Sequence, residues 1–196
     1  MGHREALLAA ARRLLRTKGY AHITARDLVA ESGTNLASIG YHFGSKAGLL
    51  NEAIGEAMQD WTEQLARIAM ADPAASTAER GLSAWSAMLE GLVRERELVV
   101  SYLEALAQAE REPVLREQFA EQYRRCRARV AELVAESLGE GARPDDPSVK
   151  AVASFVIAVC DGLAVQWVLD PDELPTGEEL RSGVRTVWDR SHHTEQ

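Results

Sequence analysis

The sequence predicts an all-α protein built from two parts. Along most of the 196 residues, apolar side chains recur at the three- and four-residue spacing of amphipathic helices. No stretch shows the alternation of apolar and polar residues that a half-buried strand requires. Short segments rich in glycine and proline interrupt the helical pattern, and the clearest is GEGARPDDP at residues 139–147.

Three helices are predicted near the N-terminus. A helix over residues 4–17 carries one stripe of leucine and alanine. Thr24 and Asp27 have the spacing of a capping box, which begins a short helix that continues to Ser32. A second short helix is expected at about 36–42.

Longer helices follow, each marked by one apolar stripe. Ser45 suits the cap of a helix that runs to about residue 71, and Pro113 suits a first helical position. The other helices are expected near residues 82–92, 99–106, 113–138, 148–169 and 178–190.

The segment 148–169 differs from the others because it is apolar nearly all round. A helix of this kind must be covered on more than one side. Packed with 178–190 against the same two helices of a second copy, it would complete a four-helix bundle. We therefore expect a homodimer, and the expected interface residues are Phe155, Val159, Trp167, Val184 and Trp188.

Asp161 and Gly162 interrupt this apolar segment. A buried aspartate needs a partner or a face toward water, and a glycine within a helix costs about 1 kcal/mol relative to alanine. A close helix crossing at Gly162 is the favoured interpretation. A ligand contact made by Asp161 is the alternative.

Composition limits the class of protein. With 46% hydrophobic residues the chain can bury a sizeable core. We expect no membrane-spanning segment, because no run of about 20 apolar residues is evident, and no signal peptide is evident either. The two cysteines are expected to be reduced core residues of a cytoplasmic protein. No histidine has a metal-ligand partner at helical spacing, so neither a metal nor another cofactor is expected.

Charge is unevenly distributed along the chain. The net charge is -8, yet the first 50 residues carry seven lysines and arginines against three acidic residues. The remainder is correspondingly acidic. This asymmetry predicts that the N-terminal part contacts an anion and that the rest of the chain does not.

The stretch TNLASIGYHFGSK at residues 34–46 is the candidate for that contact. Two short helices joined at Gly33, with a third helix packed before them, form a helix-turn-helix. The second short helix is the right size to enter a DNA major groove, which is about 12 Å wide. Beneath it, a small core is expected to consist of Leu28, Val29, Ile39 and Phe43. Its outward residues are expected to be Asn35, Leu36, Ala37, Ser38, Tyr41 and His42.

Different roles are expected for the outward residues. Tyr41 and His42 can donate hydrogen bonds to phosphates, and Lys46 adds positive charge just beyond them. Ser38, in the middle of the helix, is expected to influence which base pairs are preferred.

Residues 6–50 resemble the tetracycline-repressor-like (TetR) family of transcriptional regulators. The likeness lies in RTKGY, ITARDLVAESG and TNLASIGYHFGSKAGLL, and it continues more weakly through YLEALAQAEREPVLREQFAEQYRR and DGLAVQWVLDPD. Many members have a tyrosine at the position of Gly40, so Tyr41 is expected to carry more of the phosphate contact here. The resemblance implies DNA contacts at Thr24, Arg26, Asn35, Ala37, Ser38, Tyr41, His42 and Lys46.

The resemblance also implies a ligand-responsive regulator, expected to be a repressor. Its helix-turn-helix domain, residues 1–46, would bind palindromic double-stranded operator DNA as part of a homodimer. The helical domain 47–196 would dimerise and bind a small apolar or aromatic effector that releases the DNA. The pocket for this effector is expected to be lined by Trp61, Trp85, Met88, Leu103, Phe119, Tyr123 and Cys126.

Two alternatives follow from the sequence as well. One is an enzyme built on a helical bundle, although no paired Glu-x-x-His motif, Ser/His/Asp set or glycine-rich phosphate loop is found. The other is a dimeric DNA-binding protein with a solid core and no ligand, because periodicity does not distinguish a filled core from a hollow one.

Overall fold

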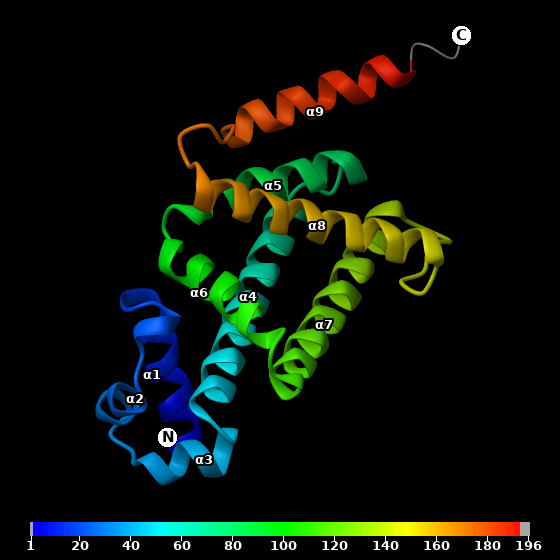
Figure 1. Cartoon of the computed structure of the whole chain (residues 1–196). Coiled ribbons are helices and arrows are strands. Elements are labelled where there is room, and N and C mark those ends of the chain that lie inside the picture. Colours follow the sequence, from blue (N-terminus) through cyan, green and yellow to red (C-terminus); the bar gives the residue numbers. More distant parts are fainter. Residues whose placement is uncertain (1, 193–196) are drawn as a thin grey trace. The chain divides into compact units, whose positions relative to one another are not determined.

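The computed structural model of the chain describes residues 2–192, and side chains as far as Thr186 (Figure 1). Every regular element in this part of the chain is helical, which confirms the all-α prediction. The elements are α1 (His3–Thr17), the 3-10 turn η1 (Tyr20–His22), α2 (Ala25–Ser32), α3 (Leu36–Phe43), α4 (Lys46–Ala69), α5 (Thr77–Leu92), α6 (Arg96–Ala109), α7 (Pro113–Leu138), α8 (Pro147–Leu169) and α9 (Gly177–His192).

The helix ends follow local capping chemistry. The capping box expected at α2 is present, since the Thr24 hydroxyl accepts from the Asp27 amide at 3.1 Å and the Asp27 carboxylate accepts from the Thr24 amide at 2.8 Å. Ser45 accepts from the amide of Gly48 at 2.9 Å, as the sequence predicts for the start of α4. A box that was not predicted, between Ser76 and Glu79, begins α5 at Thr77.

The chain divides into two compact units. The first unit contains the residues through Trp61 together with Glu95–Cys126, and the second contains Thr62–Arg94 together with the residues from Arg127 onward. The long helices α4 and α7 therefore each contribute residues to both units.

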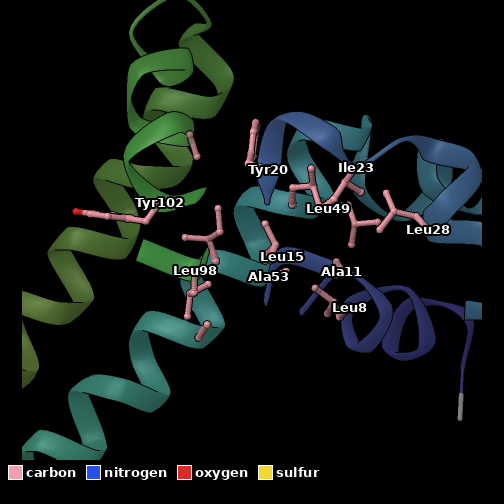
Figure 2. Close-up of a cluster of buried hydrophobic side chains, with 14 of the residues drawn as sticks. Leu8, Ala11, Leu15, Tyr20, Ile23, Leu28, Leu49, Ala53, Leu98 and Tyr102 are labelled. Carbon is pink, nitrogen blue, oxygen red and sulfur yellow. The ribbon is translucent and has the colours of Figure 1, made fainter. Parts of the chain in front are cut away.

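The first unit has a shared hydrophobic core, part of which is drawn in Figure 2. The leucine and alanine stripe of α1 is buried in it, and so are Leu28 and Ile39 of the two short helices. Val29 and Phe43 pack against it and are half-buried, as predicted. The other helices of the unit contribute Leu49, Leu50, Ala53, Ile54, Leu98, Tyr102, Ala105, Leu115 and Phe119.

This shared core changes the predicted division of the chain. α1, α2 and α3 have no core of their own, because side chains of α4, α6 and α7 complete it. The predicted boundary at residue 46 is therefore not a packing boundary. It stays a prediction about where DNA binding ends and effector binding begins.

In the second unit, α5 packs against both α8 and α9. Ser86 of α5 donates a hydrogen bond to the carbonyl of Gly177 at 2.7 Å. A Cβ at Gly177 would lie only 2.7 Å from the Cβ of Ser86, so the start of α9 approaches α5 this closely because residue 177 is glycine. A second cluster joins the end of α7 to the start of α8, through Ala131, Val134, Ala135, Val149 and Ala153.

One face of α8 is uncovered within the described chain. Phe155 is 56% exposed and Leu169 is 79% exposed, while Leu163 and Trp167 on the other face are buried. A Cβ built at Gly162 would meet no atom within 4 Å. The close helix crossing expected at Gly162 is therefore not made by another helix of the described chain. A crossing with a helix of a second copy stays a prediction.

Helix α8 also corrects the expectation about apolar runs. By length and composition it would suffice to cross a membrane, and it is the one such helix in the part of the chain that the structure describes. Its only charged residues are Lys150 and Asp161. The interruption at Asp161 and Gly162 hid this run at the level of sequence. Composition alone does not separate a membrane segment from a helix that packs against protein, and α8 buries one face on its own chain.

Candidate nucleic-acid interface

The two short helices α2 and α3 are set by glycines at their ends. Gly33 ends α2 with φ of 66°, and Gly44 ends α3 with φ of 72°. Side-chain-bearing residues rarely adopt such angles, so the two glycines fix the turn between the helices and the exit toward α4. The helix-turn-helix expected around Gly33 is thus present in the backbone.

The outward face of α3 is strongly exposed. Tyr41 is 86% exposed and Leu36 is 55% exposed, and Ala37 and Gly40 beside them are exposed too. The ring of Tyr41 meets the ring of His42 edge to face, with centroids 4.8 Å apart. His42 itself is half-buried. Of the predicted outward residues, Asn35, Leu36, Ala37 and Tyr41 are exposed, as expected.

Ser38 does not face outward as predicted. Its side chain is buried, and its hydroxyl lies 3.2 Å from Asn35 Oδ1 and 3.1 Å from His3 Nδ1 of α1. The reason is the helical period: Ser38 follows Leu36 and Ala37 around α3 onto the side that faces α1, where Ile39 is also buried. A direct base contact by Ser38 has no support from this arrangement.

Thr24 and Asn35 are both helix caps. The Thr24 hydroxyl is engaged with Asp27, and Asn35 Oδ1 accepts from the Ser38 amide at 3.0 Å. Both residues are exposed. The Asn35 amide nitrogen is left to donate outward, because only its oxygen is used in the cap.

Lys46 and Arg26 are the cations nearest to the two short helices in sequence. Lys46 donates a hydrogen bond to the carbonyl of Ile23 at 2.7 Å, which fixes the segment that precedes α2. An ammonium group has two further N–H donors, so this bond does not prevent a phosphate contact. Arg26 is exposed, and no carboxylate among the described residues pairs with it.

Most of the other positive charges near the N-terminus are already paired. Arg13 pairs with Glu31 at 2.7 Å and Lys18 pairs with Asp27 at 2.8 Å. The remaining pairs are Arg4 with Glu52, Arg12 with Glu56 and Asp60, and Arg16 with Glu95. The charge count of the first 50 residues therefore overstates the free positive charge there, since acidic side chains from later in the chain lie against α1. The positive charge that no carboxylate of the described residues pairs with lies at Arg26 and Lys46.

Asp27 shows how firmly one of these pairs is held. The hydrogen bond from Lys18, followed by those from the Thr24 backbone and hydroxyl, lowers the pKa of the Asp27 carboxyl. The carboxylate stays ionised in any neutral solution, and it both caps α2 and neutralises Lys18.

Sequence reasoning missed a buried polar network behind the two short helices. Tyr20 of η1 is buried, its hydroxyl donates to Asn51 Oδ1 at 3.2 Å, and its amide donates to Ser101 Oγ at 3.0 Å. Gln122 donates to the carbonyl of Asn51 at 3.0 Å. Burial, helped by nearby Glu112 and Glu104, raises the pKa of Tyr20 to about 12. An asparagine on the apolar stripe of α4 was the one available signal.

The predicted effector residues fall in both units. Trp61, Leu103, Phe119, Tyr123 and Cys126 belong to the first unit, and Trp85 and Met88 belong to the second. Within the first unit, the hydroxyls of Tyr102 and Tyr123 are hydrogen-bonded, and the rings of Tyr102 and Phe119 meet edge to face at 6.2 Å. In the second unit Trp85 and Met88 are buried. That these seven residues form one pocket stays a prediction.

The predicted dimer residues have different surroundings. Phe155 is exposed, apart from an edge-to-face contact with Trp85 at 6.2 Å, and Val159 and Val184 are half-buried. Trp167 is buried within its own unit, so little of its surface is free for a partner. The side chain of Trp188 lies outside the described residues.

Comparisons with known sequences identify both parts of the chain. The profile of the bacterial regulatory proteins of the tetR family matches residues 7–53, and that of the BetI-type transcriptional repressor C-terminal region matches residues 77–190. No curated protein matches the chain.

Solved structures share the fold over nearly the whole length. The multidrug binding protein EbrR complexed with proflavin is 27% identical, with 94% of this chain and 99% of that chain covered and a TM-score of 0.62. A transcriptional regulator from Rhodococcus sp. RHA1 is 17% identical, with 93% of each chain covered and a TM-score of 0.73. A regulator from Saccharomonospora viridis in complex with choline is 22% identical, with 93% of each chain covered and a TM-score of 0.61. At their levels of identity the last two show the fold alone.

The C-terminal profile spans more than half of the chain, and the N-terminal profile covers α2, α3 and most of α1. The proteins that these profiles describe regulate transcription and are not enzymes. The chain belongs to the TetR family of bacterial transcriptional regulators.

Proposed function

We propose that the chain is a repressor, that it binds palindromic operator DNA as a homodimer, and that a small apolar or aromatic effector releases it. The observation that carries the proposal is the outward face of α3. A short helix whose outer side chains are exposed, with Tyr41 at 86%, and which is held from behind by a shared core, is suited to enter a major groove.

Phosphate contacts would surround this helix. Tyr41 and the Asn35 amide can donate hydrogen bonds, and Arg26 and Lys46 supply charge that no carboxylate of the described chain neutralises. Such contacts fix the register on the duplex and carry most of the salt dependence. His42, half-buried beside Tyr41, would contribute a further donor at the edge of the surface.

Dimerisation is supported by the uncovered face of α8. Val152, Phe155, Gly162 and Leu169 follow one another at helical spacing, and each of the three with a side chain is exposed. Exposed apolar side chains gathered on one face of a helix mark an interaction surface. A second copy of the chain would cover this stripe, because the same face of α8 from each copy can meet around a two-fold axis. Glycine at 162 would let the two helices approach each other closely.

Two copies are also needed for operator binding. One eight-residue helix makes too few base and phosphate contacts for tight binding, whereas two half-sites about 34–36 Å apart double the number. The operator would then share the two-fold symmetry of the protein.

An effector is supported by the relatives, one of which holds proflavin and another choline. None of the seven predicted pocket residues is charged, which favours an apolar or aromatic molecule over an anionic metabolite. Effector binding would release DNA only to the extent that the molecule prefers the DNA-free state of the protein.

Genomic mapping of sites bound by the full chain tests the proposal. We expect enriched sites with inverted half-sites, protection of both halves in footprinting, and a sedimentation mass of two chains on one site. A compound screen on the protein–DNA complex, followed by the fluorescence of Trp61 and Trp85, then tests release. Monomeric binding to single half-sites would refute the dimer, and charged hydrophilic compounds as the sole releasing hits would refute the effector class.

A further inference from the structure

The outer face of α3 lacks the side chains that usually read bases. Arginine or lysine reads guanine, asparagine or glutamine reads adenine, and carboxylates accept from cytosine. The helix sequence LASIGYHF contains none of these residues. Its one small hydroxyl, at Ser38, is buried and bonded to Asn35 and His3.

The outward side chains are instead mostly apolar. Leu36 and Ala37 occupy the first turn, and Gly40 and Tyr41 lie one turn later on the same side. All four are exposed, with Leu36 at 55%. A Cβ at Gly40 would meet nothing within 4 Å, so the face is open and the backbone can come close to a ligand.

We propose that this face selects operator half-sites through the 5-methyl groups of thymine, with Leu36 and Ala37 as the readers. The thymine methyl is the one apolar feature on the major-groove edge of a base pair, and apolar side chains recognise it by contact. The inference rests on the proposed function, because it requires that α3 enters the major groove. It adds which bases are chosen and which residues choose them.

Hydrogen bonds to base edges would contribute little to the sequence preference in this arrangement. The Asn35 oxygen is used in the cap of α3, so Asn35 has only its amide nitrogen to offer and cannot make the two-bond contact to adenine. Tyr41 lies a turn further on, where its hydroxyl suits a phosphate. The preferred half-site should therefore contain adjacent thymines opposite the first turn of α3.

Deoxyuridine substitution tests the methyl contact directly. Duplexes enriched by the full chain from a random library are resynthesised with each thymidine in turn replaced by deoxyuridine, which deletes the methyl group and keeps every hydrogen-bonding group. We expect Kd to rise about fourfold for each methyl that Leu36 or Ala37 buries, from the transfer free energy of one carbon. Unchanged Kd at every thymidine would overturn the proposal.

Two variants separate side-chain contact from DNA shape. Leu36→Ala leaves the core untouched because Leu36 is exposed, and it should abolish the effect of deoxyuridine at one position and keep it elsewhere. Val114→Ala is the matched control: it truncates an exposed apolar side chain of α7, outside the helix-turn-helix, and should keep the full effect. A deoxyuridine effect that persists unchanged in Leu36→Ala would assign the preference to DNA deformability instead. If no duplex is enriched at all, the proposed function fails, which is a different result from enriched duplexes that tolerate deoxyuridine.

Discussion

Helices α3 and α8 both expose large apolar side chains, but their neighbours differ. On α3, exposed Leu36 and Tyr41 follow the cap Asn35 in sequence, and the elements before and after α3 carry the cations Arg26 and Lys46. On α8, exposed Phe155 lies on a face that is apolar over most of 23 residues. The two helices therefore suit different partners, although the exposed fractions of Leu36 and Phe155, 55% and 56%, are nearly equal.

The difference shows that exposure alone does not identify a partner. An apolar patch surrounded by donors and positive charge can meet a polyanion that carries isolated methyl groups, since the surrounding groups satisfy the phosphates. A long apolar stripe without such neighbours would leave phosphates desolvated and unpaired, so it suits a protein surface of the same kind. Substitutions on α8 should accordingly impair dimerisation, and substitutions on α3 should impair DNA binding.

Val159→Arg on α8 should have the largest effect, which is loss of the proposed homodimer. Val159 is half-buried at the edge of the uncovered stripe, and an arginine there would place an unpaired charge in an apolar seam, at a cost of about 3–5 kcal/mol. Sedimentation should show monomers at concentrations where the unchanged protein is dimeric. Val93→Arg makes the same chemical change at an exposed valine after α5 and should leave the dimer intact. Dimers in both variants would place the interface elsewhere.

Two leucines, one buried and one exposed, allow a comparison of covered and uncovered apolar surface. Leu28→Ala in α2 should lower the free energy of unfolding by about 2–5 kcal/mol, because Leu28 is fully buried in the shared core. Leu36→Ala in α3 removes the same atoms from an exposed site, so it should change stability by less than about 0.5 kcal/mol. Urea unfolding of both variants measures the difference. Equal losses of stability would show that Leu36 is covered in solution.

Much of this fold follows from the sequence because its signals are local. The stripe of α1, the capping box of Thr24 and Asp27, and the break at Gly33 depend on residues within one or two turns of one another. Each was predicted at its observed place. The 3-10 turn at Tyr20 was not, since it is held by side chains of Asn51 and Ser101 that are distant in sequence.

The candidate site was less predictable for the same reason. Inward and outward residues of an eight-residue helix differ by a small rotation, and the rotation of α3 is set by α1, where His3 meets Ser38. A charge count likewise cannot show that the arginines of α1 face Glu52, Glu56 and Asp60. The charge asymmetry, the two short helices around Gly33 and the resemblance to the TetR family placed the site, but none of them shows which side chains are free to act there.

Tyr20→Phe tests the polar network that the sequence did not reveal. Loss of the hydrogen bond to Asn51 should lower the free energy of unfolding by about 1 kcal/mol near neutral pH. The folded pKa of Tyr20, about 12, lies above the ordinary value of 10.0, so the unfolded chain loses this proton first as the pH rises. The tyrosine therefore contributes its full stability below pH 10.0 and loses it between pH 10.0 and about 12. Urea unfolding should show that the difference in free energy of unfolding between the two proteins shrinks over that range. A difference that does not change with pH would contradict the raised pKa.

The smallest expected effect concerns the positive charge beside α3. Lys46→Ala should weaken binding to every DNA sequence by a similar factor and reduce the slope of log Kd against log salt by about one unit for each phosphate that Lys46 neutralises. Its ammonium group has donors to spare after the bond to Ile23, and no carboxylate of the described chain neutralises it. Arg12→Ala removes the same charge from a side chain that already pairs with Glu56 and Asp60, so it should leave the slope nearly unchanged. Salt titrations on a selected duplex and on a random duplex measure both slopes. If Arg12→Ala lowered the slope as much as Lys46→Ala does, the ion pairs of α1 would have to break when the protein binds DNA. More positive charge near α3 would then be free to neutralise phosphates than the DNA-free chain presents.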